Sequence, residues 1–233
     1  MRKMKNIAVI PARSGSKGLK DKNIKMLSGK PLLAYSVEAA LKSGEFDTVH
    51  VSTDSKEYAE IAREWGAEVP FLRNAEMSSD TASTWEAMRY VLKEYEKKGY
   101  VFDTITVLQP TSPLRTAQDI QGAFSFFRKK QANMISSVCE MEHSPLWSNV
   151  LPEDFSMENF EDENLAFLPR QSLPTYYREN GAIYIVKTEH LFLEKNIYKK
   201  KCYAYLMQSS HSVDIDNELD FMIAETVMKH LKA

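Results

Sequence analysis

Short apolar runs alternate along this chain with segments whose apolar residues recur at helical spacing, and this alternation limits the possible folds more than any other feature. The apolar runs are continuous, as expected for strands of a sheet that is covered on both faces. The runs occupy residues 6–11, 48–52, 68–72, 104–108 and 134–139, and the helical segments occupy residues 31–42, 56–65 and 85–95. The order of these elements predicts an α/β fold, a three-layer sandwich around a mainly parallel sheet.

The pattern changes after Cys139. Residues 140–177 contain four prolines and the acidic segment MENFEDEN, so a sheet strand fits poorly there. Strands return at residues 181–186 and 202–207, and a closing helix begins at about Asn217. We therefore predict an α/β domain made of residues 1–139 and 181–233, with residues 140–180 inserted as an arm or lid.

Composition and patterning exclude several classes of protein. The near balance of 30 basic and 32 acidic residues argues against a general nucleic-acid or polyanion binder. The apolar run near the first residue spans only residues 7–10, and no later run reaches the length of a membrane span. Cys139 and Cys202 lie in apolar segments, which favours core residues over a disulfide or zinc site. We expect a cytoplasmic protein with no nucleic-acid or membrane partner.

Positive charge is concentrated on one loop, in the stretch IAVIPARSGSKGLKDKN at residues 7–23. A predicted strand changes there into a loop that holds two glycines beside Arg13, Lys17, Lys20 and Lys22. Loops after parallel strands line the ligand crevice, and a glycine turn lets backbone N–H groups approach phosphate oxygens. The spacing matches neither G-x-G-x-x-G nor the Walker A pattern. A solvated basic turn is the alternative, but the position after the first strand favours a phosphate site.

Six ordered segments, spread from one end of the chain to the other, resemble the N-acylneuraminate cytidylyltransferase family, the CMP-sialic acid synthetases. The segments are PARSGSKGLKDKN at 11–23, SDTAST at 79–84, LQPTSPLR at 108–115, PRQ at 169–171, NGAIYI at 180–185 and VDIDNELD at 213–220. The resemblance implies a Rossmann-like sheet of the nucleotidyltransferase type. It also implies an enzyme that transfers CMP from CTP to the anomeric hydroxyl of a nine-carbon acid sugar such as N-acetylneuraminate, with release of pyrophosphate.

Two other functions remain open. The substrate could be legionaminate or another acid sugar, because the sequence does not distinguish nine-carbon sugars that differ in their N-acyl groups or tails. A regulatory protein that binds the nucleotide without turnover is the second alternative, and the aspartate pair in VDIDNELD argues against it.

The resemblance assigns the nucleotide to the first loop and to two later positions. Triphosphate contacts are implied for Arg13, Ser16, Lys17 and Lys22, and base contacts for Asn23, Arg73 and Thr84. The amide of Asn23 can both donate and accept hydrogen bonds, as the edge of cytosine requires. Arg13, Lys17 and Lys22 would also act in catalysis by neutralising phosphate charge. For SDTAST the alternative is a helix N-cap, and both roles can hold together.

The sugar end of the site is assigned by the same resemblance. It comprises Gln109, Arg170, Gln171 and Tyr184. Arginine can hold a carboxylate through two hydrogen bonds, so Arg170 is the leading candidate for the acid group of the sugar. Tyr184 alone would be interpreted as a core residue of a strand. For Arg115, an exposed helix start or a structural ion pair is at least as well supported as ligand contact.

A divalent cation is predicted from VDIDNELD. Asp214 and Asp216 are two residues apart, so on an extended backbone both carboxylates point to the same side. They are therefore candidate metal ligands and catalytic residues, with Mg²⁺ expected and Mn²⁺ as the alternative. A helix N-cap at Asp216 or Asn217 would explain one acid but not both. No general base is predicted, and His143 is left without a role, as is His211.

The arm carries aromatic residues without a core period. They are Trp147, Phe155, Phe160 and Phe167. Such a segment favours burial against another subunit, and the family that the chain resembles is dimeric, with an arm that helps to complete the neighbouring site. We therefore expect a homodimer.

Overall fold

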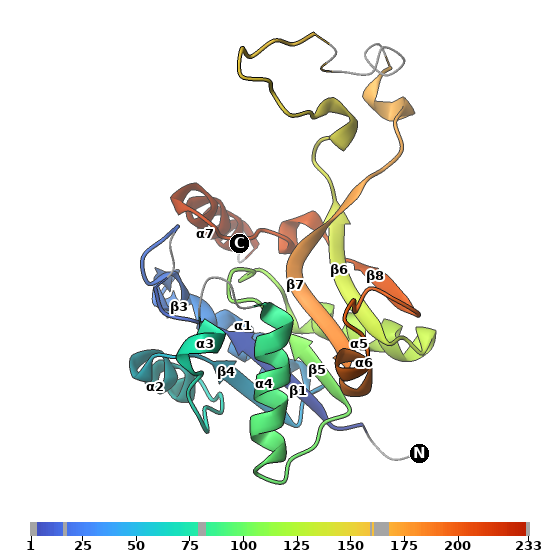
Figure 1. Cartoon of the computed structure of the whole chain (residues 1–233). Coiled ribbons are helices and arrows are strands. Elements are labelled where there is room, and N and C mark those ends of the chain that lie inside the picture. The colour runs from blue at the N-terminus through green and yellow to red at the C-terminus, as the bar shows by residue number, and fades with distance from the viewer. Residues whose placement is uncertain (1–3, 16–17, 79–82, 159, 161–167, 232–233) are drawn as a thin grey trace.

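A six-stranded sheet forms the centre of the computed structural model, which describes residues 4–15, 18–78, 83–158, 160 and 168–231 (Figure 1). The strand order is β4-β1-β5-β7-β6-β8. These strands are β1 (Asn6–Pro11), β4 (Thr48–Ser52), β5 (Thr104–Val107), β6 (Met134–Glu140), β7 (Tyr177–Lys187) and β8 (Cys202–Leu206). Within this sheet β7 runs antiparallel to both of its neighbours, and the other pairs are parallel. The prediction of a mainly parallel sheet is confirmed.

Helices cover both faces of the sheet, which confirms the three layers. One face packs on α1 (Leu32–Ser43), α2 (Lys56–Glu64) and α5 (Ala117–Lys130), and the other on α4 (Thr84–Glu96) and α6 (Thr188–Leu193). Strand β1 shows why both faces of the sheet are covered. Ala8 and Ile10 point into the first helical layer, whereas Ile7 and Val9 point into the second. All four are fully buried, so the strand needs apolar residues on both sides.

The remaining elements are short, apart from the last helix. They are the hairpin of β2 (Met26–Leu27) and β3 (Lys30–Pro31), helix α3 (Ala75–Ser78), the 3₁₀ helices η1 (Lys22–Ile24), η2 (Pro145–Trp147), η3 (Arg170–Ser172) and η4 (Ser209–His211), and α7 (Glu218–Leu231). Helix α7 packs its buried side on Leu27, Leu32 and Leu114. The described helices are too short or too polar to cross a bilayer.

The predicted strand at residues 68–72 is wrong. Its extended backbone contacts the edge of β4 only through a single bridge between Glu68 and His50. Pro70, which has no N–H group to donate, follows two residues later and cannot continue a ladder. Phe71 turns instead into an aromatic cluster with His50 and Tyr95. The apolar run therefore reflects packing beside the sheet and not membership of it.

The inserted arm leaves the sheet between two strands that pair with each other. Cys139 of β6 faces Arg178 of β7, and Glu140 faces Tyr177. The β6–β7 ladder therefore includes residues 177–180, which we predicted to belong to the arm. Both chain segments are extended in this part of the ladder. Beyond it the described parts of the arm reach away from the sheet (Figure 1). The arm exposes large apolar side chains, including Val150, Phe155 and Met157, and Phe167 lies outside the described residues.

Candidate functional site

Loops from distant parts of the chain meet at the carboxyl ends of the central strands β1 and β5. The Nζ atom of Lys22, in the loop after β1, donates to Ile215 O at 2.6 Å and to Asp216 Oδ1 at 3.2 Å. The N–H group of Ile215 donates to Thr111 O, in the loop after β5, at 2.9 Å. The predicted phosphate loop, the LQPTSPLR loop and the VDID segment therefore form one surface.

The first loop is fixed at both ends by hydrogen bonds. Asp54 accepts from the N–H of Ser14 at 2.8 Å and from its hydroxyl at 2.9 Å. Burial acts to raise the pKa of Asp54, but the Ser14 bonds and the charge of Arg73 outweigh burial and lower it. Asn23 is buried and donates from Nδ2 to Arg13 O at 3.0 Å, which closes the loop on itself. Ser16 and Lys17, which we predicted at the triphosphate, lie outside the described residues.

Gly18 allows the first loop to touch the VDID segment. A Cβ atom at this position would lie 2.6 Å from Asp216 O, closer than a carbon can approach a backbone oxygen. The loop therefore needs glycine there for contact and not for flexibility.

Two arginines lie close together at the end of β4. Arg73 donates from Nε to Ser52 Oγ and from Nη2 to Ser52 O, both at 3.1 Å. Burial lowers the pKa of Arg73, the negative charge of Asp54 acts against this, and the positive charge of Arg13 lowers the pKa again. Arg13 itself donates to Ser78 O at 3.4 Å. Two guanidinium groups near enough to repel each other are an arrangement that an anion would stabilise.

Thr84, the other predicted base contact, is exposed in the first turn of α4. The cap of this helix is Ser83, whose hydroxyl accepts from the backbone while Glu86 accepts from the N–H of Ser83. The capping interpretation of SDTAST is therefore confirmed for Ser83, which leaves the hydroxyl of Thr84 outside the capping box.

Arg115 is buried, so the alternative of an exposed helix start is wrong, and the structural alternative is favoured. Its Nη1 atom donates to Ala182 O at 2.9 Å and to Gln109 O at 3.2 Å, and Nη2 donates to the hydroxyl of Ser36. Burial lowers the pKa of Arg115 to about 9. The guanidinium thus joins the LQPTSPLR loop to β7 and α1, and it acts as a structural residue that holds the backbone of Gln109.

Gln109 lies against Gly181 and Asp214. A Cβ atom at Gly181 would stand 2.8 Å from Gln109 Oε1 and 3.6 Å from Asp214 Oδ2, and the φ of Gly181 is +71°. Thr111 donates to Gln109 Oε1 at 3.4 Å. The structure thus brings together one predicted sugar residue and one predicted metal ligand across a glycine that leaves room for both.

The two aspartates of VDID fit a cation site. Burial raises the pKa of Asp214, a bond from Thr111 acts against this, and the charge of Asp216 raises it again. Within the described residues Asp214 Oδ1 is buried and has no hydrogen-bond partner. An orphaned carboxylate oxygen beside a second carboxylate is an arrangement that a divalent cation would satisfy. The described residues contain no group of three or more acidic, histidine or cysteine side chains placed for a metal, so further ligands would come from substrate or water.

The N-cap of α7 does not use either aspartate. Asn217 Oδ1 accepts from the N–H of Asp220 at 3.1 Å, and Asp220 Oδ2 accepts from the N–H of Asn217 at 3.1 Å. This reciprocal pair is a capping box. The alternative that Asp216 caps the helix is therefore wrong, and Asn217 takes that role.

Tyr184, a predicted sugar residue, lies on β7. Its ring packs edge-on against Trp85 with centroids 5.8 Å apart. Burial, followed by the charges of Glu179 and Asp214, raises the pKa of Tyr184 to about 12. Its hydroxyl therefore lies near both carboxylates, which supports more than a packing role.

Sequence reasoning missed Arg178. Its positive charge acts on Asp214, and it forms an ion pair with Glu142 at 3.3 Å. The sequence feature that could have indicated Arg178 is its position, two residues before the Asn-Gly pair of NGAIYI and at the base of the arm.

Arg170 and Gln171 are not brought to this surface in their own chain. Both belong to η3, which lies on the arm well away from the sheet (Figure 1). Gln171 is exposed there. Their assignment to the sugar stays a prediction that depends on a neighbouring subunit.

One of the two histidines without an assigned role, His211, makes a structural contact. His211 Nδ1 lies 2.9 Å from Asp119 Oδ2, the carboxylate that also completes the cap of α5. This contact fixes the turn that precedes Asp214. His143 is exposed on the arm.

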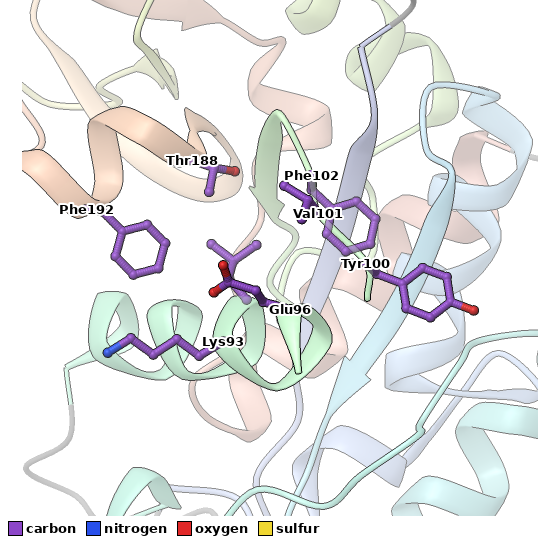
Figure 2. A pocket seen from close by; sticks show the side chains of 8 residues that line it. Lys93, Glu96, Tyr100, Val101, Phe102, Thr188 and Phe192 are labelled. Atoms are coloured by element: carbon purple, nitrogen blue, oxygen red, sulfur yellow. The ribbon is translucent and has the colours of Figure 1, made fainter. Parts of the chain in front are cut away.

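A pocket of about 270 Å³ lies between α4 and α6, away from this surface (Figure 2). Val101 and Phe102, which precede β5, line it with Phe192, and Lys93 and Glu96 supply its charged groups. It is therefore at the opposite end of β5 from Gln109. None of the predicted site residues lines it, so it is separate from the candidate active site.

Comparisons with known proteins agree with the motifs. A sequence model of the family described as cytidylyltransferase matches residues 7–231. The chain is 37% identical over 227 residues to an N-acylneuraminate cytidylyltransferase of Escherichia coli O18:K1:H7, which covers 97% of this chain and 52% of that protein. It is 34% identical over 236 residues to the CMP-N,N'-diacetyllegionaminic acid synthase of Legionella pneumophila, which covers 97% of each chain.

The chain thus spans about half the length of the Escherichia coli relative and nearly all of the Legionella one. Among solved structures, a CMP:2-keto-3-deoxy-manno-octonic acid synthetase complexed with CTP superposes with a TM-score of 0.72 and 16% identity, over 97% of this chain and 99% of that one. Such low identity shows the fold alone, and the fold is the one that the resemblance implied. By its motifs, its fold and the match over residues 7–231, the chain belongs to the cytidylyltransferase family.

Proposed function

We propose that this protein transfers CMP from CTP to the anomeric hydroxyl of a nine-carbon acid sugar and releases pyrophosphate. The observation that carries the proposal is the meeting of Lys22, Asp214, Asp216 and Gln109 on one surface. This surface combines a cation and two carboxylates for phosphate chemistry with a neutral amide for a polyhydroxylated substrate. The relatives named for sialic and legionaminic acid support the same class of substrate.

Positioning and charge neutralisation would carry most of the catalysis. The sugar hydroxyl attacks the α-phosphorus of CTP in line, a new P–O bond forms, and the bond to pyrophosphate breaks. Arg13 and Arg73 lie close together where an anion would relieve their repulsion, and Lys22 is fixed beside the aspartates. These cations would hold the triphosphate and stabilise the departing pyrophosphate.

Asp214 and Asp216 would hold a magnesium ion, with manganese as the alternative. The buried, unpartnered Oδ1 atom of Asp214 supports this assignment, and Lys22 keeps Asp216 beside it. When bound, a divalent cation neutralises phosphate oxygens and lowers the pKa of a hydroxyl group that it contacts. Because Asn217 and Asp220 provide the helix cap, both aspartates are available for this role.

The proposed assembly is a homodimer in the cytoplasm, in which the arm of one subunit reaches the site of the other. The exposed apolar side chains of the arm, among them Phe155 at 75% exposure, support burial by a partner. Arg170 and Gln171 would then contact the sugar of the neighbouring subunit. The two cysteines, which are free in the structure, suit a reducing compartment. Light scattering that reports a 26.7 kDa monomer at micromolar concentration would contradict the dimer.

Pyrophosphate release with CTP tests the main proposal. The assay would include N-acetylneuraminate, legionaminate, a pseudaminate and an octulosonate, each with CTP and with UTP as the nucleotide control. We expect turnover with CTP and with at least one nine-carbon sugar. The assay with legionaminate matters because the Legionella relative matches along nearly its whole length. If no sugar reacts, the enzyme assignment is overturned.

A further inference from the structure

A hydrogen-bonded carboxylate lies beside Tyr184 and has no part in the chemistry described so far. Glu179 Oε1 accepts from the hydroxyl of Ser136 at 2.5 Å and from the hydroxyl of Tyr198 at 2.9 Å. Glu179 is nevertheless exposed to solvent. Two donors thus hold one carboxylate oxygen, and within the described part of the chain no hydrogen bond reaches the other.

This carboxylate extends the candidate site in one direction. Ser136 pairs with Tyr184 across β6 and β7, so Glu179 and the ring of Tyr184 approach the same position. The charges of Glu179 and Asp214 both act on the hydroxyl of Tyr184, after burial the largest effects on its pKa. Asp214 and Glu179 therefore both lie within electrostatic reach of the Tyr184 hydroxyl.

The strand order of the sheet shows on which side of the candidate site Glu179 lies. The first loop follows β1, whereas Glu179 belongs to β7 and its partners to β6 and to the segment before β8. These strands lie on the far side of β5 from β4. Glu179 is thus displaced from the cations of the nucleotide end. A sugar whose anomeric hydroxyl reaches the phosphate would extend its remaining atoms toward it.

We infer that Glu179 is a specificity residue whose second carboxylate oxygen accepts a hydrogen bond from a hydroxyl group on the open-chain tail of the acid sugar. The inference rests on the proposed function. An ionised carboxylate only accepts hydrogen bonds, so it selects a donor, and it repels the carboxylate of the sugar itself. It therefore orients the substrate, with the acid group away from Glu179 and the tail hydroxyls toward it.

The competing explanation is structural, since Glu179 could simply hold the Tyr198 segment in place. The substitution Glu179→Gln separates the two roles. A glutamine oxygen can still accept from Ser136 and Tyr198, so the local fold survives. The negative charge, and with it the strong bond to a substrate hydroxyl, is lost.

The experiment measures kcat and KM for Glu179→Gln with the nine-carbon sugar that the wild-type protein uses best and with an analogue shortened in its tail. We expect the sugar KM to rise about 10-fold or more with the full sugar, with the CTP KM unchanged. With the shortened analogue, variant and wild type should differ by less than about 2-fold, since the hydroxyl in question is gone. Glu189→Gln is the matched control for loss of charge, because Glu189 is an exposed carboxylate in the first turn of α6, just past the opposite end of β7.

Two results would overturn the inference. One is equal kinetics of variant and wild type with the full sugar. The other is an equal loss with both sugars, which Tyr198→Phe should then reproduce if the role is structural. Failure of the wild-type protein with every sugar would instead overturn the proposed function, and this inference with it. Melting temperatures of the variants show whether each is folded.

Discussion

The ammonium group of Lys22 lies 3.2 Å from Asp216 Oδ1, although 194 positions separate the two residues in the chain. Lys22 also donates to the neighbouring carbonyl of Ile215. One side chain thus ties the loop after the first strand to the segment before the last helix. The proposed phosphate-binding and metal-binding residues are therefore positioned by each other.

Replacing Lys22 should impair the chemical step more than the stability of the fold. Lys22→Gln removes a cation at the proposed phosphate site and loosens Asp216, and we expect kcat to fall about 10²-fold or more. Lys22→Arg keeps the charge and should recover part of the rate. Steady-state kinetics with varied CTP would measure both. A normal kcat in Lys22→Gln, with the variant fully folded, would show that this contact has no catalytic role.

The aspartate pair should be needed for catalysis and not for folding. Asp214→Asn and Asp216→Asn each remove one anionic ligand at nearly constant shape, and we expect kcat to fall about 10²- to 10⁴-fold. The magnesium concentration for half-maximal rate should rise as well. Magnesium titrations of kcat, with melting curves in parallel, test this.

Asn217→Ala is the control for the aspartate pair. It removes the helix cap and should cost about 1 kcal/mol of stability while leaving the magnesium dependence unchanged. Normal rates and magnesium dependence in both aspartate variants would place the metal elsewhere.

Arg115 should matter for stability through its three hydrogen-bond partners. Arg115→Met fills the space but removes the guanidinium that donates to Ala182 O and Gln109 O. Gln109 O still accepts from Ser36 and Ser112, so the main cost is the lost donor to Ala182 O, about 1 to 3 kcal/mol for a buried group left unsatisfied. Urea unfolding would show the loss as a lower midpoint. Ser36→Ala, which removes a single partner, should lose less. An unchanged midpoint in Arg115→Met would contradict the structural role.

His50 should make the fold sensitive to mild acid. Burial lowers its pKa to about 3, a hydrogen bond to Glu68 O acts against this, and the charge of Arg73 lowers it further. Since the unfolded chain binds a proton near pH 6.5 and the folded one does not, stability is complete above that pH. It declines as the pH falls toward 3, by about 2 kcal/mol at pH 5.

Urea unfolding between pH 5 and 7.5 measures this dependence. His50→Gln cannot take up the proton, so its stability should change less over this range than that of the wild-type protein. Parallel pH profiles for the two proteins would show that His50 does not contribute.

The sequence predicted the sheet best where residues are buried on both faces. The bounds of β1 and β4 agree with the prediction, because every second side chain enters a different apolar layer. Residues 68–72 are also rich in apolar side chains, but the strand predicted there does not form. Hydrophobicity indicates burial but not which backbone completes the hydrogen bonds. Pro70 was the physical signal against a strand, and it was available in the sequence.

The candidate site was predictable where one motif supplies several of its residues. Asp214 and Asp216 share a strand-like segment, so their spacing alone indicated a common side. Arg178 and Glu179 were missed because their importance comes from contacts across strands. Glu179 meets Tyr198 and Ser136 only after β6, β7 and the segment before β8 have come together. No local pattern encodes such a meeting.

The arm leaves the sheet at Glu140 and returns at Tyr177, and these two residues face each other in the ladder. Partners in an antiparallel ladder have Cα atoms roughly 5 Å apart, so the insertion begins and ends at almost the same point. Its length can change at a small entropic cost and without any shift in strand register. Evolution, or a protein engineer, can therefore replace this segment while the proposed nucleotide-binding loops after the other strands stay unchanged.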